Sequence, residues 1–131
     1  MTSELLDTLG ALRKKPARAV ELYEQLYRAR FVAVVQRGSE AALESMLFLT
    51  YDTKDGVQEL PIFTRDEFVL DGLRDDSVRV TLKGPALWPR LLDIVETGRC
   101  EIAVDPGQAH GIRMRREMVL GMVSKYGEGN R

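Results

Sequence analysis

Residues 78–104 read VRVTLKGPALWPRLLDIVETGRCEIAV, and this stretch decides the fold. Polar and apolar residues alternate over Val78–Leu82, which predicts a strand. Pro85 suits the first turn of a helix, and the mainly apolar run Cys100–Val104 predicts a second strand. A right-handed crossover joins two such strands in parallel. The helix expected over 85–97 has its apolar positions at Leu87, Leu91, Ile94 and Val95.

Three further strands are predicted before this unit. Phe31–Val35 is apolar and β-branched, as in strands that are buried on both faces. Met46–Tyr51 and Val57–Phe63 flank the turn residues 52–56, a hairpin signal, so these three strands should pair antiparallel. Pro61 cannot donate a ladder hydrogen bond, which predicts an edge, a bulge or a strand end at that point.

Helices are predicted at both ends of the chain and after the third strand. Leucines at helical spacing and a proline break indicate two helices, or one kinked helix, over 3–29. The capping box TRDE at 64–67 predicts a helix that carries Phe68 and Leu73 inward. A last helix is expected over about 113–125.

Together these elements predict an α+β fold. Its core would be one mixed five-stranded sheet, with an antiparallel βββ part and β-α-β-α-β crossovers, covered by helices. The chain has 131 residues, the size of one domain. We therefore expect a single domain over 1–126 and a disordered tail over 127–131.

The composition argues against several kinds of site. Cys100 is the one cysteine and His110 the one histidine, so the chain has no intrachain disulfide and too few ligands for a zinc site. No metal and no cofactor are predicted. No apolar run is long enough to cross a bilayer, and the N-terminus does not resemble a signal peptide. We expect a cytoplasmic protein with no membrane partner.

The net charge of −1 hides an asymmetry along the chain. Residues 1–40 carry seven basic and five acidic side chains, residues 41–80 carry four and nine, and residues 81–131 carry eight and six. Nucleic-acid-binding proteins usually show a basic excess or stripe, so no nucleic-acid partner is predicted. Arg113 and its basic neighbours are either solvated or in contact with the acidic middle segment, within the chain or across a dimer.

A small-molecule site would lie where the third, fourth and fifth strands end. Parallel strands share one rim at their carboxyl ends, and ligands of open α/β sheets favour that rim. Helix N-termini expected there would add unpaired amides that suit an anionic or zwitterionic ligand. The other interpretation is ordinary turns with solvated charges. The residues just past the strand ends are Thr64, Arg65, Asp66, Lys83, Gly84, Asp105 and His110.

Two groups of side chains admit a buried or an exposed interpretation. Met114, Met118 and Met122 recur at spacing four, which is typical of a core stripe or of an adaptable partner-binding face. Trp88 either packs in the core or anchors an interface. The antiparallel strands over 31–63 should also leave an open edge, which a second copy, another partner or the N-terminal helices would cover.

No catalytic group is predicted. His110 is the one imidazole available as a general base, and it lies in the glycine-rich stretch 107–111, which favours a solvated loop residue. Cys100 begins a buried strand without an activating base, so it is expected to be a small core side chain. We therefore expect a protein that is not an enzyme.

Three phrases occur in a characteristic order: LPIFTRDE at 60–67, LKGPAL at 82–87 and VDPG at 104–107. In order and spacing they resemble the SseB N-terminal domain family, named for enhanced serine sensitivity. The similarity covers about residues 20–123. It implies a cytoplasmic bacterial α/β domain and brings no catalytic residues to carry over.

The leading hypothesis is a non-enzymatic binding or regulatory module that binds a protein partner or forms a homodimer. A small acidic secretion-type chaperone is the alternative from another class. Such chaperones run their later strands together as neighbours, so the helix expected over 85–97 argues against this alternative. A small-ligand-binding domain with its site at the rim of the sheet is the third hypothesis.

Overall fold

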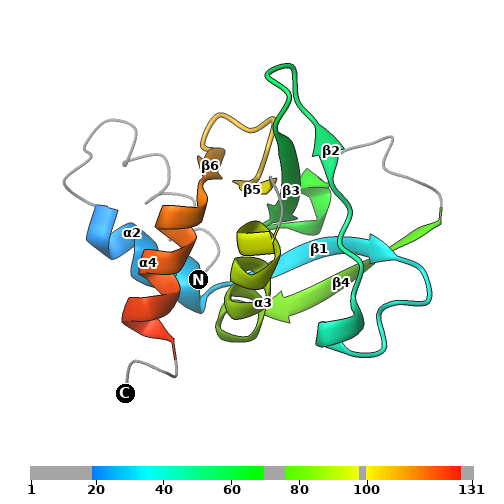
Figure 1. Cartoon of the computed structure of the whole chain (residues 1–131), viewed down its shortest axis with the longest axis horizontal. Coiled ribbons are helices and arrows are strands. Elements are labelled where there is room, and N and C mark those ends of the chain that lie inside the picture. The colour runs from blue at the N-terminus through cyan, green and yellow to red at the C-terminus, as the bar shows by residue number, and fades with distance from the viewer. Residues whose placement is uncertain (1–18, 70–75, 98–99, 128–131) are drawn as a thin grey trace.

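The chain folds into three α-helices and six strands in the computed structural model, which describes residues 19–69, 76–97 and 100–127 (Figure 1). No helix in these described ranges is long and apolar enough to cross a membrane. The elements in chain order are α2 (Ala19–Arg28), β1 (Arg30–Gln36), the 3-10 turn η2 (Leu43–Ser45), β2 (Tyr51–Asp52), β3 (Gln58–Phe63), the 3-10 turn η3 (Asp66–Phe68), β4 (Ser77–Lys83), α3 (Gly84–Thr97), β5 (Cys100–Val104), β6 (Ile112–Met114) and α4 (Arg116–Tyr126).

The strands form one mixed sheet in the order β4-β1-β3-β5-β6, with β2 paired to β3 beside this path. β1 is antiparallel to both β3 and β4, whereas β3 and β5 are parallel. β3, β4 and β5 therefore run in one direction, although β1 separates β4 from β3. The predicted α+β class with a mixed sheet is confirmed. The crossover after β4 skips two strands because β5 pairs with β3.

Besides the helix expected from the capping box at 64–67, where the described residues hold only the 3-10 turn η3, two of the expected elements differ. The segment Met46–Tyr51 is not a full strand: Phe48 makes one bridge to Val35, and β2 has only two residues. Its buried side chains are Met46 and Leu49, three residues apart, so they do not follow the alternation of a strand.

The other difference is at the start of the last helix, where the chain forms β6 instead. Ile112 and Met114 turn toward the core while Arg113 turns to the other face, which is the period of two that a strand requires. α4 therefore begins at Arg116, three residues later than predicted.

Pro61 lies inside the sheet and not at an edge. β3 pairs with β2 at Gln58 and Glu59 and with β1 at Ile62 and Phe63, and Pro61 falls between these two ladders. The carbonyl of Ile62 faces β5, where it accepts the Asp105 N–H at 2.9 Å. Main-chain groups alternate along a strand, so the nitrogen of Pro61 faces the gap between the ladders, where no donor is required.

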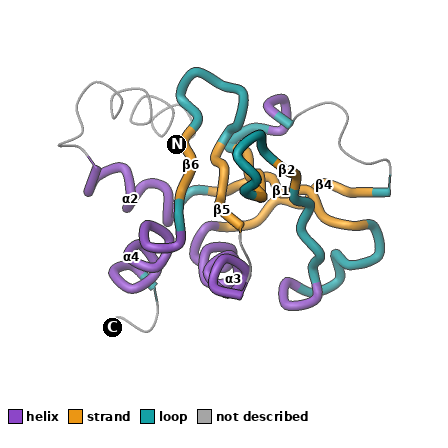
Figure 2. The backbone as a smooth tube through the Cα atoms, turned by 45° about the horizontal axis from the view of Figure 1, so that its top comes forward, coloured by secondary structure: helices purple, strands orange, loops and turns teal. Residues whose placement is uncertain are grey.

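α2, α3 and α4 gather on one face of the sheet (Figure 2). At the centre of this core, the Trp88 indole N–H donates to the Leu26 carbonyl at 2.9 Å, and the ring meets Phe31 edge-on at 5.6 Å. The largest fully buried side chains on this face are Leu22, Leu26, Phe31, Leu60, Ile62, Leu87, Trp88, Leu91, Ile102 and Met114.

Four residues were considered for a partner interface, and the packing places three of them in the core instead. Trp88, Met114 and Met122 are buried inside the chain itself, and Met118 packs against the same core while half-buried. A buried side chain has no surface left for a partner to cover. The core interpretation therefore holds for Trp88 and for Met114 and Met122 of the methionine stripe. Cys100 is likewise buried, as expected.

The opposite face carries a second, smaller apolar cluster and no helix among the described residues longer than a 3-10 turn. Phe63 is its fully buried centre, packed with Val32, Val34 and Leu49, and Phe68 from η3 covers it in part. Elsewhere on this face the side chains of Arg79, Thr81 and Lys83 are exposed. The sheet therefore has a covered face that holds the fold together and a second face on which polar side chains are accessible.

Candidate functional site

A buried carboxylate ties the end of β5 to the end of β3. Asp105 has no exposed surface. Its Oδ1 accepts the Thr64 main-chain N–H at 2.8 Å, and its Oδ2 accepts the Thr64 hydroxyl at 2.6 Å. Nε2 of His110 lies 2.7 Å from the same Oδ2. A carboxylate only accepts, so this nitrogen carries a proton that it donates to Asp105.

The capping box expected at 64–67 does not form. The hydroxyl and the N–H of Thr64 are both engaged by Asp105, and η3 starts without a side-chain cap. In place of the helix start the described residues hold only the 3-10 turn, and Leu73 lies outside the described residues. A partner 41 residues away in sequence has displaced the local capping arrangement.

His110 is not the solvated loop residue that its glycine-rich surroundings indicated. Its side chain is 17% exposed, and the ring lies 5.6 Å from that of Phe68. The guanidinium of Arg65 lies over the ring of Phe68, 6.0 Å from its centre. Four of the predicted rim residues, Thr64, Arg65, Asp105 and His110, therefore belong to one cluster.

The remaining rim residues lie elsewhere. Lys83 ends β4, which is three strands away from β5, or about 14 Å at the usual spacing of neighbouring strands. The Gly84 N–H donates to the Ala29 carbonyl at 2.7 Å, so it is not an unpaired helix amide. Asp66 forms an ion pair with Arg79 at 2.9 Å. The structure thus divides the seven residues, and ligand binding by them stays a prediction.

A hollow of about 270 Å³ opens beside the β5–β6 loop on the face opposite the helices. One wall is the loop itself, and the other is formed by Glu59 and Arg113, which are hydrogen bonded to each other. The lining residues are Glu59, Ala103, Pro106, Gly107, Gln108, Gly111, Ile112 and Arg113.

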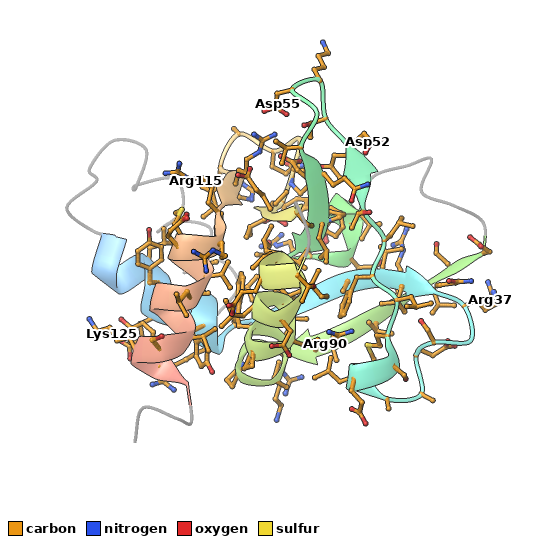
Figure 3. The ribbon with its side chains drawn as sticks, viewed as in Figure 1. Arg37, Asp52, Asp55, Arg90, Arg115 and Lys125 are labelled. Atoms are coloured by element: carbon orange, nitrogen blue, oxygen red, sulfur yellow. The ribbon has the colours of Figure 1, made fainter. Side chains whose placement is uncertain are left out.

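Arg113 is the centre of an ion-pair network along this wall. Besides Glu59 it meets Asp55, with 3.1 Å between Nη1 and Oδ2, and Glu101, with 3.2 Å between Nε and Oε1. The Tyr51 hydroxyl donates to Glu59 at 2.7 Å. Figure 3 shows Asp55 near the tip of the β2–β3 hairpin, which this network ties to β6. Of the two interpretations of Arg113, contact with the acidic middle segment within the chain is the correct one.

The network shifts the ionisation of its members. Hydrogen bonds from Thr53 and then from Arg113 lower the pKa of Asp55 to about 2. Burial and the neighbouring Glu59 raise the pKa of Tyr51 above its ordinary value. With three carboxylates around one guanidinium, the wall is net negative, which disfavours an anionic ligand in the hollow. An anionic ligand, one of the two kinds expected at the rim, therefore has no matching charge here.

A third feature is the outer edge of β4 (Figure 1). At one end of the β1–β4 ladder, the Arg37 N–H donates to the Asp76 carbonyl at 2.7 Å. At the other end, the Gly84 N–H donates to the Ala29 carbonyl. The even-numbered residues 76 and 84 thus turn their main-chain groups toward β1, and main-chain groups alternate between the two sides of a strand.

It follows that the main-chain N–H and C=O groups of Arg79, Thr81 and Lys83 point away from β1, along the edge of the sheet. The pairing with β1 is continuous over seven residues, without a proline, a glycine or a bulge. The side chains of Val80 and Leu82 pack against the core under the helices, while those of the three odd-numbered residues are exposed on the other face.

The sequence predicted an open edge on the strands over 31–63. Of these strands, β1 has β4 and β3 on its two sides, whereas the two-residue β2 pairs only with β3. The longer edge among the described residues belongs to the fourth predicted strand, β4, which the sequence did not indicate. Periodicity marks β4 as a strand that is buried on one face, but it carries no information on which strand lies beside it. The network of Arg113 was indicated only by the acidic surplus of residues 41–80, and the hollow by no sequence signal.

Comparison with known proteins supports the resemblance seen in the sequence. The family model described as SseB protein N-terminal domain matches residues 3–120. Searches of curated proteins and of solved structures found no match. Because the matched residues make up most of the chain, the protein belongs to the SseB N-terminal domain family.

Proposed function

We propose that this domain is a non-enzymatic protein-binding module that receives an extended segment of a partner as an additional strand along β4. The observation that supports the proposal is the outward row of main-chain groups at Arg79, Thr81 and Lys83 on a regular seven-residue edge. Such a row is a template for strand addition, in which main-chain hydrogen bonds supply affinity and alternate side chains supply specificity.

Apart from its two exposed cations, Arg79 and Lys83, β4 carries none of the devices by which proteins usually block an edge strand, as far as the described residues show. Natural edges are shortened, bulged, interrupted by proline, covered, or given charged side chains, either along the edge or on the core-facing side. In β4 the core-facing positions are Val78, Val80 and Leu82, and its pairing with β1 is continuous over seven residues. At the other end of the sheet β6 has only three residues, which offers a partner fewer hydrogen bonds.

The chaperone alternative receives no support. The helix that argued against it is present as α3, and β1 and β3 lie between the strands on either side of it. The small-ligand alternative has the hollow beside the β5–β6 loop, but its wall is occupied by the paired side chains of Glu59 and Arg113. The open edge therefore remains the best-supported surface for function.

Selection of peptide ligands from a randomised display library against the full chain tests the proposal. We compare Thr81→Pro, which removes one outward N–H at a position where an edge strand tolerates proline, with Thr81→Val, which keeps it. Binders should lose at least tenfold in affinity for Thr81→Pro and bind Thr81→Val about as well as the wild type, a difference of about 1.4 kcal/mol or more.

The fold of both variants is checked by the emission of the buried Trp88. On binding, the amides of Arg79, Thr81 and Lys83 should become protected from hydrogen exchange. Selected peptides that bind Thr81→Pro unchanged, or that protect amides of the β5–β6 loop instead, would show that β4 is not the binding surface.

A further inference from the structure

We infer that the segment received by β4 is acidic at two positions four residues apart, with apolar residues between them at every second position. This inference rests on the proposed function and names the chemistry of its partner. It follows from the charges on the exposed face of β4 and from the apolar side chains on its other face.

The exposed face of β4 is basic. Arg79 and Lys83 lie on it four residues apart, and Arg30 of β1 pairs in register with Lys83, so these two cations stand side by side. Within the described ranges neither Arg30 nor Lys83 has an ion-pair partner. Directly opposite side chains of neighbouring strands come within about 5 Å, so an acidic residue of an added strand would relieve this repulsion at Lys83.

Arg79 is only partly neutralised. It pairs with Asp66 at 2.9 Å, yet its side chain remains 49% exposed and lies at the edge. An acidic side chain of the added strand opposite Arg79 would share the guanidinium with Asp66. The two acidic positions of the partner are set by the period of the strand: residues opposite Arg79, Thr81 and Lys83 share one face, whichever direction the added strand runs.

The other face sets the apolar positions. Val80 and Leu82 are half-buried and pack against the core beneath the helices, so the sheet's apolar layer continues to the edge. Side chains of the added strand opposite them would extend that layer. The pattern of the partner is therefore acidic, apolar, polar, apolar, acidic over five residues.

A second copy of this chain fits the edge less well. In a symmetric antiparallel pair with Thr81 on the twofold axis, Arg79 would face Lys83 of the second copy, and like charges in opposite positions are destabilising. With Val80 on the axis, Arg79 faces Thr81 and Lys83 faces Ser77, and no acidic partner is supplied. The charges of β4 thus favour a different, acidic segment.

The test uses two synthetic peptides that differ only in charge. Both carry Val-Thr-Val between two variable residues and have identical neutral flanks; one has glutamate at both variable positions and the other lysine. Binding to the full chain is measured by fluorescence anisotropy at low and high salt. We expect the glutamate peptide to bind about tenfold tighter at low salt, because two cross-strand pairs change from like to opposite charge. The preference should shrink as salt screens the pairs.

Charge reversal on the protein provides the matched control. Lys83→Glu should abolish or reverse the preference for the glutamate peptide, whereas Lys54→Glu should leave it intact. Lys54 is exposed in the β2–β3 turn, away from β4, and its reversal changes the net charge equally. Thr81→Pro should weaken both peptides.

The outcomes separate this inference from the proposed function. Equal binding of both peptides that Thr81→Pro abolishes would overturn the acidic partner and leave strand addition standing. Failure of both peptides to bind would also overturn the acidic partner. Tight binding that Thr81→Pro does not weaken would overturn strand addition itself. A wild-type dimer that Thr81→Pro converts to a monomer would identify a second copy, not an acidic segment, as the occupant.

Discussion

Asp105 combines two unfavourable conditions that the surrounding structure compensates. It is the one described residue other than glycine with a positive φ, 50°, and its carboxylate is fully buried. Asp and Asn tolerate this left-handed region better than other side chains. The burial is compensated by donors from Thr64 and His110. One residue thereby joins β3, β5 and the loop that follows β5.

Two substitutions of Asp105 should differ clearly in how much they lower the free energy of unfolding. Asp105→Ala should lower the free energy of unfolding by at least about 3 kcal/mol, because it adds left-handed strain and leaves buried donors without an acceptor. Asp105→Asn keeps the tolerant backbone and an acceptor for the Thr64 N–H, so it should cost less than half as much. Urea unfolding measures both. Equal losses for the two variants would mean that the backbone tolerance and the acceptor that asparagine keeps contribute little to stability.

Asp55 gives the ion-pair network a measurable acid dependence. Its pKa is lowered to about 2, first by the hydrogen bond from Thr53 and then by that from Arg113. A lowered folded-state pKa contributes stability above the ordinary value near 4, and this contribution is lost as the pH falls toward 2. Because Asp55 is exposed, the contribution to stability is small.

The informative measurement is therefore the pKa of Asp55 itself, followed by the NMR shift of its carboxyl carbon. Thr53→Val should move this pKa toward its ordinary value, and Arg113→Gln should move it in the same direction by a smaller amount. A pKa that stays near 2 in Thr53→Val would contradict the order of causes.

At the scale of elements, the start of α3 depends on a single close contact. A Cβ atom at Gly84 would lie 2.1 Å from the Tyr27 carbonyl oxygen and 2.8 Å from that of Ala29. These are main-chain atoms at the end of α2, and they cannot rotate away. Because Gly84 has no side chain, the junction between β4 and α3 can lie against the main chain at the end of α2. This short distance also lets the Gly84 N–H donate to the Ala29 carbonyl.

Gly84→Ala should accordingly destabilise the protein by about 2 kcal/mol or more, since overpacking against main chain forces the backbone to shift. Gly121→Ala is the matched control. Gly121 is exposed inside α4 with nothing within 4 Å of an added Cβ, so the change should stabilise by about 0.5–1 kcal/mol through helix propensity. Thermal unfolding of both variants measures the difference. A neutral Gly84→Ala would show that α2 can withdraw from this contact.

At the scale of the whole molecule, Trp88 shows whether the helical layer and the sheet unfold together. It is the one tryptophan of the chain and is fully buried. Its hydrogen bond reaches α2 and its edge contact reaches β1, so it joins the helical layer to the sheet. If the helical layer and the sheet were stable independently of each other, Trp88 would lie at the boundary between them, and this boundary would open first on unfolding.

We therefore expect one cooperative transition. The emission of Trp88 should move to longer wavelength on unfolding at the same urea concentration at which the far-ultraviolet circular dichroism is lost, as for a two-state domain. An emission change that precedes the loss of secondary structure would show that the helical layer separates from the sheet before the sheet unfolds.

Much of the fold was predictable because local patterns are strong where burial is complete. The apolar run of β1, the alternation of β4 and the helical spacing of α3 each lie in fewer than fifteen residues, so neighbours in the sequence carry the signal. These elements bury apolar surface in whatever arrangement they adopt. The class of the fold followed from their order.

The tertiary structure decided which elements are neighbours, and with them the candidate sites. Pro61 is tolerated in mid-sheet because two ladders leave a gap at that residue. The Thr64 hydroxyl binds Asp105 and not its own helix start, because a buried carboxylate binds a donor more strongly than a solvated cap does. Among the described strands β4 is an edge, because it pairs only with β1, whose other side is occupied by β3. Periodicity encodes the faces of an element, whereas its neighbours and long-range hydrogen bonds depend on how all elements pack at once.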